Sequence, residues 1–385
     1  MKFPKIIVAL LGQAPSKDQL LRTGSRIAGV GLWQAMERHA GIHSVVGADL
    51  PAPARLYLRV HGRLFYPKHV RFVKCHFNVR VFKWRSRNVT RKLQRIRAEE
   101  CSVVLQEGFF FSPSMARMPY YIYTDANIGM LLRGYPQARP WPTGSAAERD
   151  GWDLQRQLFR SAAGCFTFSD CCRNAVLADH GSNPDNVLTV YAGKNFSALT
   201  TADLSPKRVL FVGTHFERKG GVQLLAAWKQ IHARHPDAKL VIVGPEALPE
   251  QVPGVEFHGM VSDRDRLRAI FLSSSVFVMP SEWEAYGHVF LEAMACGLPC
   301  VGVDAFAMPE MIRHEVNGLL AVPKDVNSLA KCLDRLLSDP ALRERLSAGA
   351  LQTAKEWPDW ETVAGRMLRF MEEQLPRTSA TGSST

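Results

Sequence analysis

The chain has 385 residues, of which 46% are hydrophobic and 22% are charged, a composition typical of a globular protein large enough for two domains. The longest apolar run near the N-terminus, residues 6–11, falls far short of the roughly 18 to 20 residues that a bilayer-spanning helix needs, which excludes a transmembrane helix. Lys2 and Lys5 precede this run, but no small-residue cleavage site follows it. We therefore interpret it as a buried first strand rather than as a secretory signal.

The formal net charge of +12 is concentrated in one segment. Residues 55–98 contain 14 Lys and Arg and no Asp or Glu, so the rest of the chain carries a net charge of −2. A local basic patch indicates one anionic partner surface, whether phosphorylated, lipidic or nucleic. The apolar residues of the segment fit both strand and helix spacing, so its secondary structure stays open.

The cysteines show no metal-binding pattern, because they lie far apart or adjacent, with no CxxC pair and no Cys/His spacing typical of zinc. This favours free thiols in a reducing compartment and no structural metal. The eight residues are Cys75, Cys101, Cys165, Cys171, Cys172, Cys296, Cys300 and Cys332.

Short β-branched runs alternate with amphipathic stretches along most of the chain, the pattern of parallel sheets covered by helices. The expected strands are 5–11, 42–46, 102–105, 120–123, 165–168 and 187–191, then 208–212, 239–243, 255–258, 276–279 and 300–303. Two doubly wound α/β domains follow, with the join in residues 195–206, where the periodicity lapses. Residues 377–385 are polar, and we expect them to be disordered.

Two carboxylates follow the strand that ends at Met279. Glu284 lies in the loop, Gly287 permits a close turn, and Glu292 lies in the second turn of the next helix. Carboxylates accept hydrogen bonds from hydroxyls, whereas the free amides of a helix N-terminus bind an anion. The pattern suits a ligand with both hydroxyls and phosphate, although a solvated loop and a surface helix would explain it as well.

A second loop, residues 213–221, has the same strand, glycine and helix arrangement. Its Arg218 and Lys219 would neutralise a departing diphosphate at the mouth of the same sheet. The spacing is not that of a Walker loop. A solvated helix start is the alternative.

Together these segments resemble a known family. Glu284 and Glu292 match the E-x7-E motif of retaining glycosyltransferases of family 4 (glycosyl transferases group 1), and residues 293–299 match its Ala-Met-Ala-x-Gly-x-Pro run. The resemblance covers residues 208–375 well and the first half loosely. It implies a GT-B fold, in which two Rossmann-like domains face a cleft and the last helix returns to the first domain. We therefore place the domains at 1–197 and 198–360, the returning helix at 361–376 and the tail at 377–385.

The resemblance implies a role for each matching residue. Arg218 and Lys219 would bind the diphosphate, Glu292 the ribose hydroxyls, and Glu284 the transferred sugar. The backbone of residues 286–288 would contact sugar and phosphate, and the loop around Met260 would contact the base. The other donor-binding candidates are Gly213, Tyr286, Gly287 and His288. No metal or cofactor is expected.

The chain departs from the family pattern at several places. Thr214 stands where an arginine is usual, so Arg218 is the candidate replacement, and residues 306–307 are Phe-Ala instead of Gly-Gly. At the strand end where many members have a histidine, the chain has Asp125. This carboxylate is a candidate polar group near the anomeric carbon, and a strand-end turn or helix N-cap is the alternative.

Two further motifs have weaker meanings. Asp263 and Asp265 have the D-x-D spacing by which other glycosyltransferases hold a metal, but they precede a helix, and we prefer a helix cap. Residues 22–26 and 29–31 resemble a glycine-rich loop against which a phosphate docks, or an ordinary loop before a helix.

The basic segment lies in the domain that, by the resemblance, faces the acceptor. It fits peripheral attachment to an anionic membrane at its cytoplasmic face, since several cations at about 1 kcal/mol each suffice without a membrane span. A solvated basic face is the alternative, and nucleic-acid binding is not expected. The aromatic residues expected at the interface are Phe72, Phe77, Phe82 and Trp84. The candidate membrane-facing or acceptor-facing cations are Arg71, Lys74, Arg80, Lys83 and Arg85.

The sequence therefore predicts a metal-independent retaining glycosyltransferase that moves a sugar from a nucleoside diphosphate sugar to a hydroxyl acceptor. The resemblance extends this to cell-surface polysaccharide, lipid-linked glycan or glycolipid synthesis. A nucleotide-sugar epimerase and a glycogen phosphorylase-like enzyme are rivals, although a pyridoxal-binding lysine signature is missing. A catalytically silent scaffold that binds sugar nucleotide is the third alternative.

Overall fold

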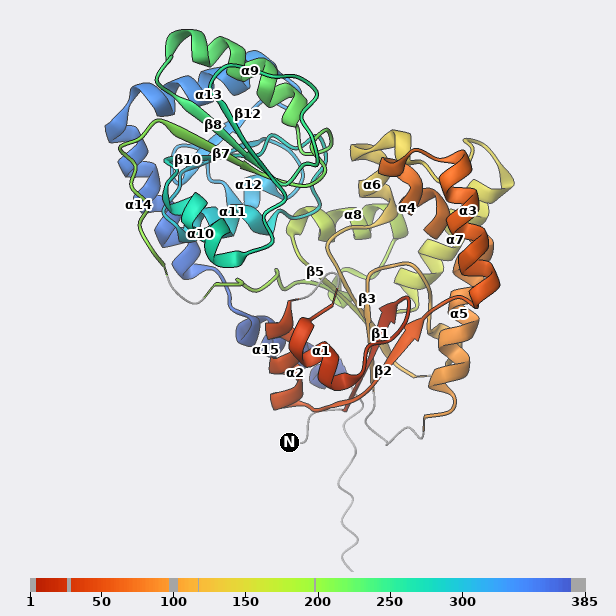
Figure 1. Cartoon of the computed structure of the whole chain (residues 1–385). Coiled ribbons are helices and arrows are strands. Elements are labelled where there is room, and N and C mark those ends of the chain that lie inside the picture. The colour runs from red at the N-terminus through yellow and green to blue at the C-terminus, as the bar shows by residue number, and fades with distance from the viewer. Residues whose placement is uncertain (1–4, 26–28, 97–102, 117, 197–198, 375–385) are drawn as a thin grey trace, which may run out of the picture.

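The computed structural model describes residues 5–25, 29–96, 103–116, 118–196 and 199–374 and contains two six-stranded parallel sheets (Figure 1). The first sheet has the order β2-β1-β3-β4-β5-β6 and the second β12-β11-β10-β7-β8-β9. The first uses β1 (Ile6–Leu11), β2 (Ile42–Ala48), β3 (Val103–Glu107), β4 (Tyr120–Thr124), β5 (Gly164–Thr167) and β6 (Val187–Thr189). The second uses β7 (Arg208–Val212), β8 (Lys239–Val243), β9 (Val255–Gly259), β10 (Val276–Val278), β11 (Cys300–Val303) and β12 (Gly318–Ala321).

Helices cover both sheets, as the alternating pattern predicts. The helices of the first half are α1 (Lys17–Thr23), α2 (Val30–His39), α3 (Ala52–Phe65), α4 (Lys68–His76), α5 (Val79–Leu93), α6 (Ile128–Gly134), α7 (Ala146–Arg160) and α8 (Asp170–His180). Those of the second half are α9 (Gly221–Arg234), α10 (Arg264–Leu272), α11 (His288–Ala295), α12 (Met308–Met311), α13 (Val326–Ser338), α14 (Pro340–Glu356) and α15 (Trp360–Gln374). Short 3₁₀ helices lie at Ser114–Ala116, Pro136–Ala138 and Pro184–Asn186.

The central strands are buried on both faces, which is why they read as continuous apolar runs. All eleven predicted strands are present, and the prediction of two doubly wound α/β sheets is confirmed. One described strand, β12, was missed, because its sequence Gly-Leu-Leu-Ala has no β-branched residue. The domain boundaries at residues 197 and 360 stay predictions.

The basic segment forms three helices, α3, α4 and α5, which resolves the ambiguity between strand and helix (Figure 1). The break between α4 and α5 is set by Asn78, whose side chain accepts hydrogen bonds from the backbone N–H groups of Arg80 and Val81. The apolar residues of α5 then fall on one buried face against the first sheet.

The last described helix, α15, returns from the second half and packs beside α2 (Figure 1). Trp360 fits there only because its neighbours are glycines: a Cβ on Gly31 would lie 2.3 Å from the indole, and one on Gly193 2.5 Å. His39 and Glu361 join the two helices with a contact of 2.7 Å. The tail predicted to be disordered lies outside the described residues.

Within the described ranges, no helix has both the length and the apolar character needed to cross a bilayer. Seven cysteines fall in these ranges and are free, while Cys101 lies outside them.

Candidate active site

The two loops singled out in the sequence meet in the structure. Because β7 and β10 are neighbours in the second sheet, the loops that follow them leave the same edge side by side. Gly220, with φ of +76°, lies so close to Pro280 that a Cβ would come within 2.0 Å of its carbonyl oxygen. The backbone N–H of Glu282 also donates to the carbonyl of Arg218, at 2.9 Å.

This junction brings Glu284 against both cations. Its Oε2 lies 3.3 Å from Lys219 Nζ and 3.7 Å from Arg218 Nη1, and all three side chains are at most 20% exposed. Oε2 is buried and has no hydrogen-bond partner among the described residues. The ion pairs occupy this buried oxygen, so a ligand hydroxyl would donate to the other carboxylate oxygen, Oε1.

The cations themselves are held in place. Arg218 Nη1 donates to the carbonyl of Trp283 at 2.7 Å, and its guanidinium lies 5.6 Å from the Trp283 ring centroid. The stem of Lys219 passes over Gly213, where a Cβ would lie 2.3 Å from Lys219 Cδ. Gly213, a predicted donor-binding residue, therefore provides room for the lysine.

The N-terminus of α11 faces the same junction. Its N-cap is Gly287, with φ of +100°, where a residue with a side chain would be strained. Burial raises the pKa of Glu292 above its usual range, against the opposing effects of Arg264 and Lys219. Burial also lowers the pKa of His288 to about 4, which makes the imidazole neutral at pH 7. The local charge that can face an anion therefore comes from Arg218, Lys219 and the helix amides.

The side chain of Tyr286, in contrast, is used within the protein. It is 3% exposed, and its hydroxyl accepts a hydrogen bond from the backbone N–H of Ala192 at 3.2 Å and one from Trp357 Nε1 at 3.2 Å. Only the Tyr286 backbone remains for a ligand, in agreement with the predicted backbone contact.

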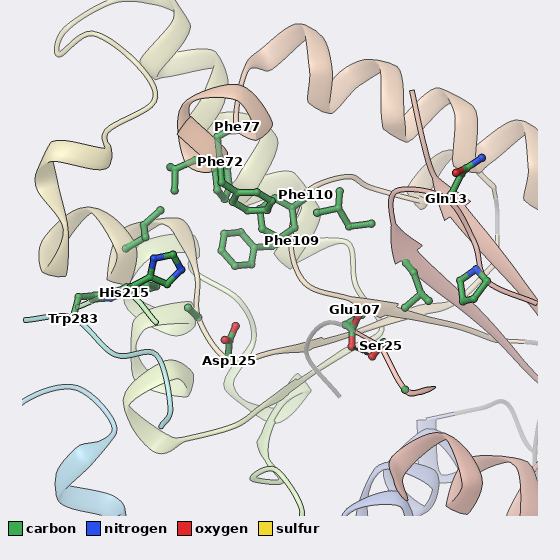
Figure 2. A pocket seen from close by; sticks show the side chains of 17 residues that line it. Gln13, Ser25, Phe72, Phe77, Glu107, Phe109, Phe110, Asp125, His215 and Trp283 are labelled. Atoms are coloured by element: carbon green, nitrogen blue, oxygen red, sulfur yellow. Dashed lines mark hydrogen bonds between the residues drawn. The ribbon is translucent and has the colours of Figure 1, made fainter. Parts of the chain in front are cut away.

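A cleft of about 760 Å³ lies between the first sheet and these loops (Figure 2). We call it the interdomain cleft. Its residues are Leu10, Leu11, Gln13, Pro15, Gly24, Ser25, Phe72, Val73, Phe77, Glu107, Phe109, Phe110, Asp125, Ala126, Leu131, His215 and Trp283. Figure 2 shows four phenylalanines gathered on one side, with Asp125 and Glu107 on the other and His215 and Trp283 at one end.

Asp125 follows β4 and lines this cleft, and its role near the anomeric carbon stays a prediction. The alternative of a helix N-cap is wrong, because α6 is capped by Asn127, whose side chain accepts from Met130 N at 2.7 Å. Burial raises the pKa of Asp125 to about 6, and the nearby charge of Glu284 adds to the rise, while Arg218 opposes it. The charges of Glu284 and Arg218, in the second half of the chain, therefore change the pKa of Asp125 in the first half.

Sequence reasoning missed Glu107 as a cleft residue. It ends β3 and is 4% exposed, and its Oε1 accepts a hydrogen bond from Ser25 Oγ, which in turn accepts one from Trp33 Nε1 at 3.1 Å. A polar residue at the carboxyl end of a buried strand was the available signal. The loop at residues 22–26 therefore reaches the cleft through Gly24 and Ser25, although Arg26 lies outside the described residues.

The segment around the Phe306-Ala307 departure has two notable features. Phe306 has φ of +56°, a conformation that favours glycine, at one of the two positions where the family usually has Gly-Gly. Glu310 accepts hydrogen bonds from the backbone N–H groups of Asp170 and Cys171, at 2.8 and 2.7 Å, and so contacts the N-terminus of α8 in the first half of the chain.

The remaining candidates are placed as follows. Asp263 is the N-cap of α10, accepting from the backbone N–H groups of Asp265 and Arg266, which confirms the cap interpretation. Met260 is 62% exposed just after β9.

The basic cations do not all face outward, and for Arg85 an outward placement is wrong. Arg85 is 3% exposed, Arg71 and Lys74 are half-buried, and Arg80 and Lys83 are exposed.

The expected interfacial aromatics also need correction. Phe77 and Phe82 are buried in the core and Phe72 lines the cleft, because the helical register turns them inward. Of the four, Trp84 is exposed, at 47%.

Comparison with known proteins supports the resemblance stated above. Residues 195–353 match the family model for Glycosyl transferases group 1. The chain is 37% identical over 168 residues to an uncharacterized glycosyltransferase of Methanocaldococcus jannaschii, a match that covers 41% of this chain and 43% of that protein. It is 31% identical over 236 residues to the phosphatidyl-myo-inositol mannosyltransferase of Mycobacterium tuberculosis, covering 57% and 62%. The first relatives are thus matched over about half of their length.

The fold is shared over nearly the whole chain. Sucrose-phosphate synthase from Thermosynechococcus elongatus superposes with a TM-score of 0.67 at 18% identity, covering 96% of this chain and 99% of that one. Anabaena HepE, solved in complex with UDP, superposes with a TM-score of 0.63 at 17% identity, covering 96% and 100%. Residues 195–353 therefore carry the glycosyl transferases group 1 sequence pattern, and the two sheets together have the GT-B fold of these solved structures.

Proposed function

We propose that the protein is a retaining glycosyltransferase that moves a sugar from a nucleoside diphosphate sugar to a hydroxyl acceptor without a metal ion. The observation that carries the proposal is the meeting of Lys219, Arg218 and the α11 N-terminus around Glu284, close enough to the cleft residue Asp125 for their charges to influence it. Fixed positive charge beside a carboxylate suits a diphosphate attached to a sugar, because the cations and amides bind the phosphates and the carboxylate accepts from a sugar hydroxyl.

Each side chain then has a distinct task. Arg218 and Lys219, with the first amides of α11, hold the diphosphate, and Glu284 accepts a hydrogen bond from a sugar hydroxyl. Glu292 accepts from the ribose, and the exposed loop at Met260 lies against the base. These cations and amides supply the positive charge that the leaving group needs, which is why we assign no metal.

The reaction follows a front-face route. The bond between the anomeric carbon and the diphosphate oxygen breaks while the acceptor oxygen bonds to the same face of the sugar. The acceptor proton passes to the departing diphosphate, whose charge Arg218 and Lys219 stabilise. Asp125 lies on the acceptor side and orients the incoming hydroxyl or the anomeric end of the sugar.

The names of similar proteins agree with this proposal. Relatives include a GDP-mannose-dependent mannosyltransferase of Corynebacterium glutamicum and a glycogen synthase of Mycobacterium tuberculosis, and HepE was solved with UDP and glucose. They support a sugar-nucleotide donor and a place in cell-surface polysaccharide, lipid-linked glycan or glycolipid synthesis.

The test is a binding and slow-hydrolysis screen of the purified protein against UDP-, GDP- and ADP-sugars with EDTA present. We expect one nucleotide to bind and its sugar to be hydrolysed slowly, with the anomeric configuration kept in any transfer product. Conversion of the sugar nucleotide to its epimer without an acceptor would instead identify an epimerase. Binding without any turnover, even with acceptor mixtures, would identify a silent scaffold.

We also propose that the protein attaches to an anionic membrane through α3. This helix exposes an apolar stripe with an i, i+4, i+8 repeat at Leu56, Val60 and Leu64, which are 48 to 72% exposed. Tyr57 and Phe65 widen the stripe, at 62 and 66% exposed. Exposed arginines on the same helix add the positive charge that favours an anionic leaflet. The attachment would place the enzyme at the cytoplasmic face of the membrane.

Substituting Leu64→Glu is expected to weaken binding to vesicles of phosphatidylcholine with 30% phosphatidylglycerol at least tenfold, because it places a charge in the apolar stripe. Vesicle sedimentation measures this, and pure phosphatidylcholine should bind the unaltered protein weakly. Val322→Glu, at a residue that is 58% exposed on the second domain, adds the same charge and should have little effect. Equal binding by both variants would disprove the α3 assignment.

A further inference from the structure

A second pocket, of about 430 Å³, lies between α3, α4, α5 and the ends of β1 and β2. We call it the arginine pocket, after four lining residues: Arg55, Arg59, Arg71 and Arg85. Arg55 and Arg59 extend from α3, Arg71 from α4 and Arg85 from α5, so three helices direct guanidinium groups to one place. In the part of the chain that the structure describes, none of the four forms an ion pair with a carboxylate.

Arg85 is the most unusual member, since it is 3% exposed without a carboxylate partner. Its Nη2 lies 2.6 Å from His76 Nδ1, and its Nη1 donates to the His76 carbonyl at 3.4 Å. An arginine can only donate, so Nδ1 accepts and this imidazole is neutral. Arg85 Nε is buried and has no hydrogen-bond partner among the described residues. Burial lowers the pKa of Arg85 to about 10, so the group stays charged at pH 7.

Arg71 is held in position by the backbone. Its Nε donates to the Gly62 carbonyl at 2.9 Å, and its Nη2 donates to the Tyr66 carbonyl at 3.2 Å. Neither partner carries a charge that would neutralise the guanidinium. The structure therefore orients a cation at the pocket and leaves its charge available.

The acidic residue that lines the pocket does not satisfy these arginines. Asp49 Oδ1 lies 2.7 Å from Lys92 Nζ and accepts a hydrogen bond from Asn88 at 2.6 Å. The negative charge of Asp49 is therefore already balanced by Lys92, which does not line the pocket. A buried cation without a counter-ion is costly, and an anionic ligand would remove that cost.

The arginine pocket adjoins the interdomain cleft, because Gln13 and Phe72 line both cavities. Phe72 packs edge to face against Phe110, with ring centroids 5.6 Å apart, so the boundary between the two cavities has an aromatic side at Phe72 and a polar side at Gln13. A ligand that holds an anionic group in one cavity can therefore extend along the phenylalanines toward Asp125 in the other (Figure 2).

From this arrangement we infer that the acceptor carries a phosphate ester, which the arginine pocket binds while the acceptor hydroxyl lies in the interdomain cleft near Asp125. This rests on the proposed function and names the class of its acceptor. Several guanidinium forks suit the many oxygens of a phosphate, each taking two parallel hydrogen bonds. The four phenylalanines of the interdomain cleft suit an acceptor whose phosphate is joined to a lipid chain, and a phosphate ester without a lipid shares the same recognition.

The first experiment compares two short-chain lipids by titration calorimetry with the full-length protein: dihexanoyl phosphatidylglycerol and dihexanoylglycerol, which lacks the phosphate. We expect the phospholipid to bind at least tenfold more tightly, and Arg55→Gln/Arg59→Gln to remove most of this preference. Both arginines are exposed, so the variant should fold. Arg63→Gln/Arg87→Gln removes the same charge from exposed arginines outside the pocket and should keep the preference.

Glycerol 3-phosphate and inorganic phosphate distinguish the possible sources of the anion. Competition by glycerol 3-phosphate supports a phosphate ester in general, and competition by the phospholipid alone supports a lipid-linked one. Inorganic phosphate that competes as well as the esters would overturn the assignment to the acceptor. Equal affinity for both lipids, or an equal loss in the control variant, would overturn the pocket itself.

Donor hydrolysis without acceptor separates this inference from the proposed function. We expect the hydrolysis rate to be unchanged in Arg55→Gln/Arg59→Gln, while transfer to a phosphorylated acceptor falls at least tenfold. If the unaltered protein hydrolyses no sugar nucleotide but keeps arginine-dependent phosphate binding, the proposed function fails and the phosphate site stands.

Discussion

Substituting Lys219→Ala is expected to lower the turnover of the sugar nucleotide by about 10²- to 10³-fold, the usual cost of losing one fixed charge at a developing anion. The Lys219 side chain is 15% exposed and its Nζ lies 3.3 Å from Glu284 Oε2, so its charge acts in a partly desolvated place. The absence of a side chain at Gly213 leaves room for the Lys219 methylene chain, and Gly220 of the same loop packs against Pro280. Initial rates of donor hydrolysis and of transfer measure the effect.

Lys229→Ala is the matched control. Lys229 is 52% exposed on α9 and pairs with Glu250 on the surface, where a salt bridge contributes at most about 1 kcal/mol. We expect near-normal turnover in this variant and an unchanged circular dichroism spectrum in both. Near-normal turnover in Lys219→Ala would remove the lysine from the proposed diphosphate site.

Glu284→Ala should lower turnover to a similar extent, because Lys219 and Arg218 hold the Glu284 carboxylate in place as the proposed acceptor for a sugar hydroxyl. Glu282→Ala, two residues earlier in the same loop, is the control, since its carboxylate is bonded to Gln223 Nε2 at 2.5 Å. Loss of activity in the control alone would indicate that loop structure, and not the Glu284 carboxylate, limits the reaction.

The fold and the meeting of the two loops at the proposed donor site could be predicted because their signals are local. A buried strand, a glycine and a helix start occupy one short segment, and the order of parallel strands brings two such segments together. Glu284, Arg218 and Lys219 could therefore be placed at one edge before their distances were known.

The acceptor side could not be predicted in the same way. The four phenylalanines of the interdomain cleft form two pairs, Phe72 with Phe77 and Phe109 with Phe110. The two pairs are more than thirty positions apart in the sequence and become neighbours only through tertiary packing. Arg85 faces inward because of the helical register of α5. The apolar spacing fitted both a strand and a helix, so this register could not be predicted. The charge count located the basic segment correctly. It could not show that α3 exposes an apolar stripe to solvent while arginines from α3, α4 and α5 line a pocket.

The pH dependence of kcat/KM in Asp125→Asn tests the proposed role of Asp125 on the acceptor side. Burial holds the pKa of Asp125 at about 6, so the carboxyl is protonated below that pH and ionised above it. If the carboxylate orients the reacting groups, kcat/KM should rise as the pH increases through about 6 in the unaltered protein. Asp125→Asn should lower the plateau by at least tenfold and remove this inflection. The exposed Asp185→Asn should leave the profile unchanged.

The same pKa predicts an opposite effect on stability, which separates the two roles of the residue. Because the folded chain holds the Asp125 proton to higher pH than the unfolded chain, the free energy of unfolding falls as the pH rises from about 4 to about 6. Asp125→Asn removes the buried charge, so well above pH 6 the variant should be more stable than the unaltered protein, by about 3 kcal/mol, with little difference at pH 4 and below. Urea unfolding at pH 4 and pH 8 measures this. A variant that is less active yet more stable at pH 8 is the signature of a carboxylate kept for chemistry, whereas a variant less stable at both pH values would make Asp125 a structural turn residue.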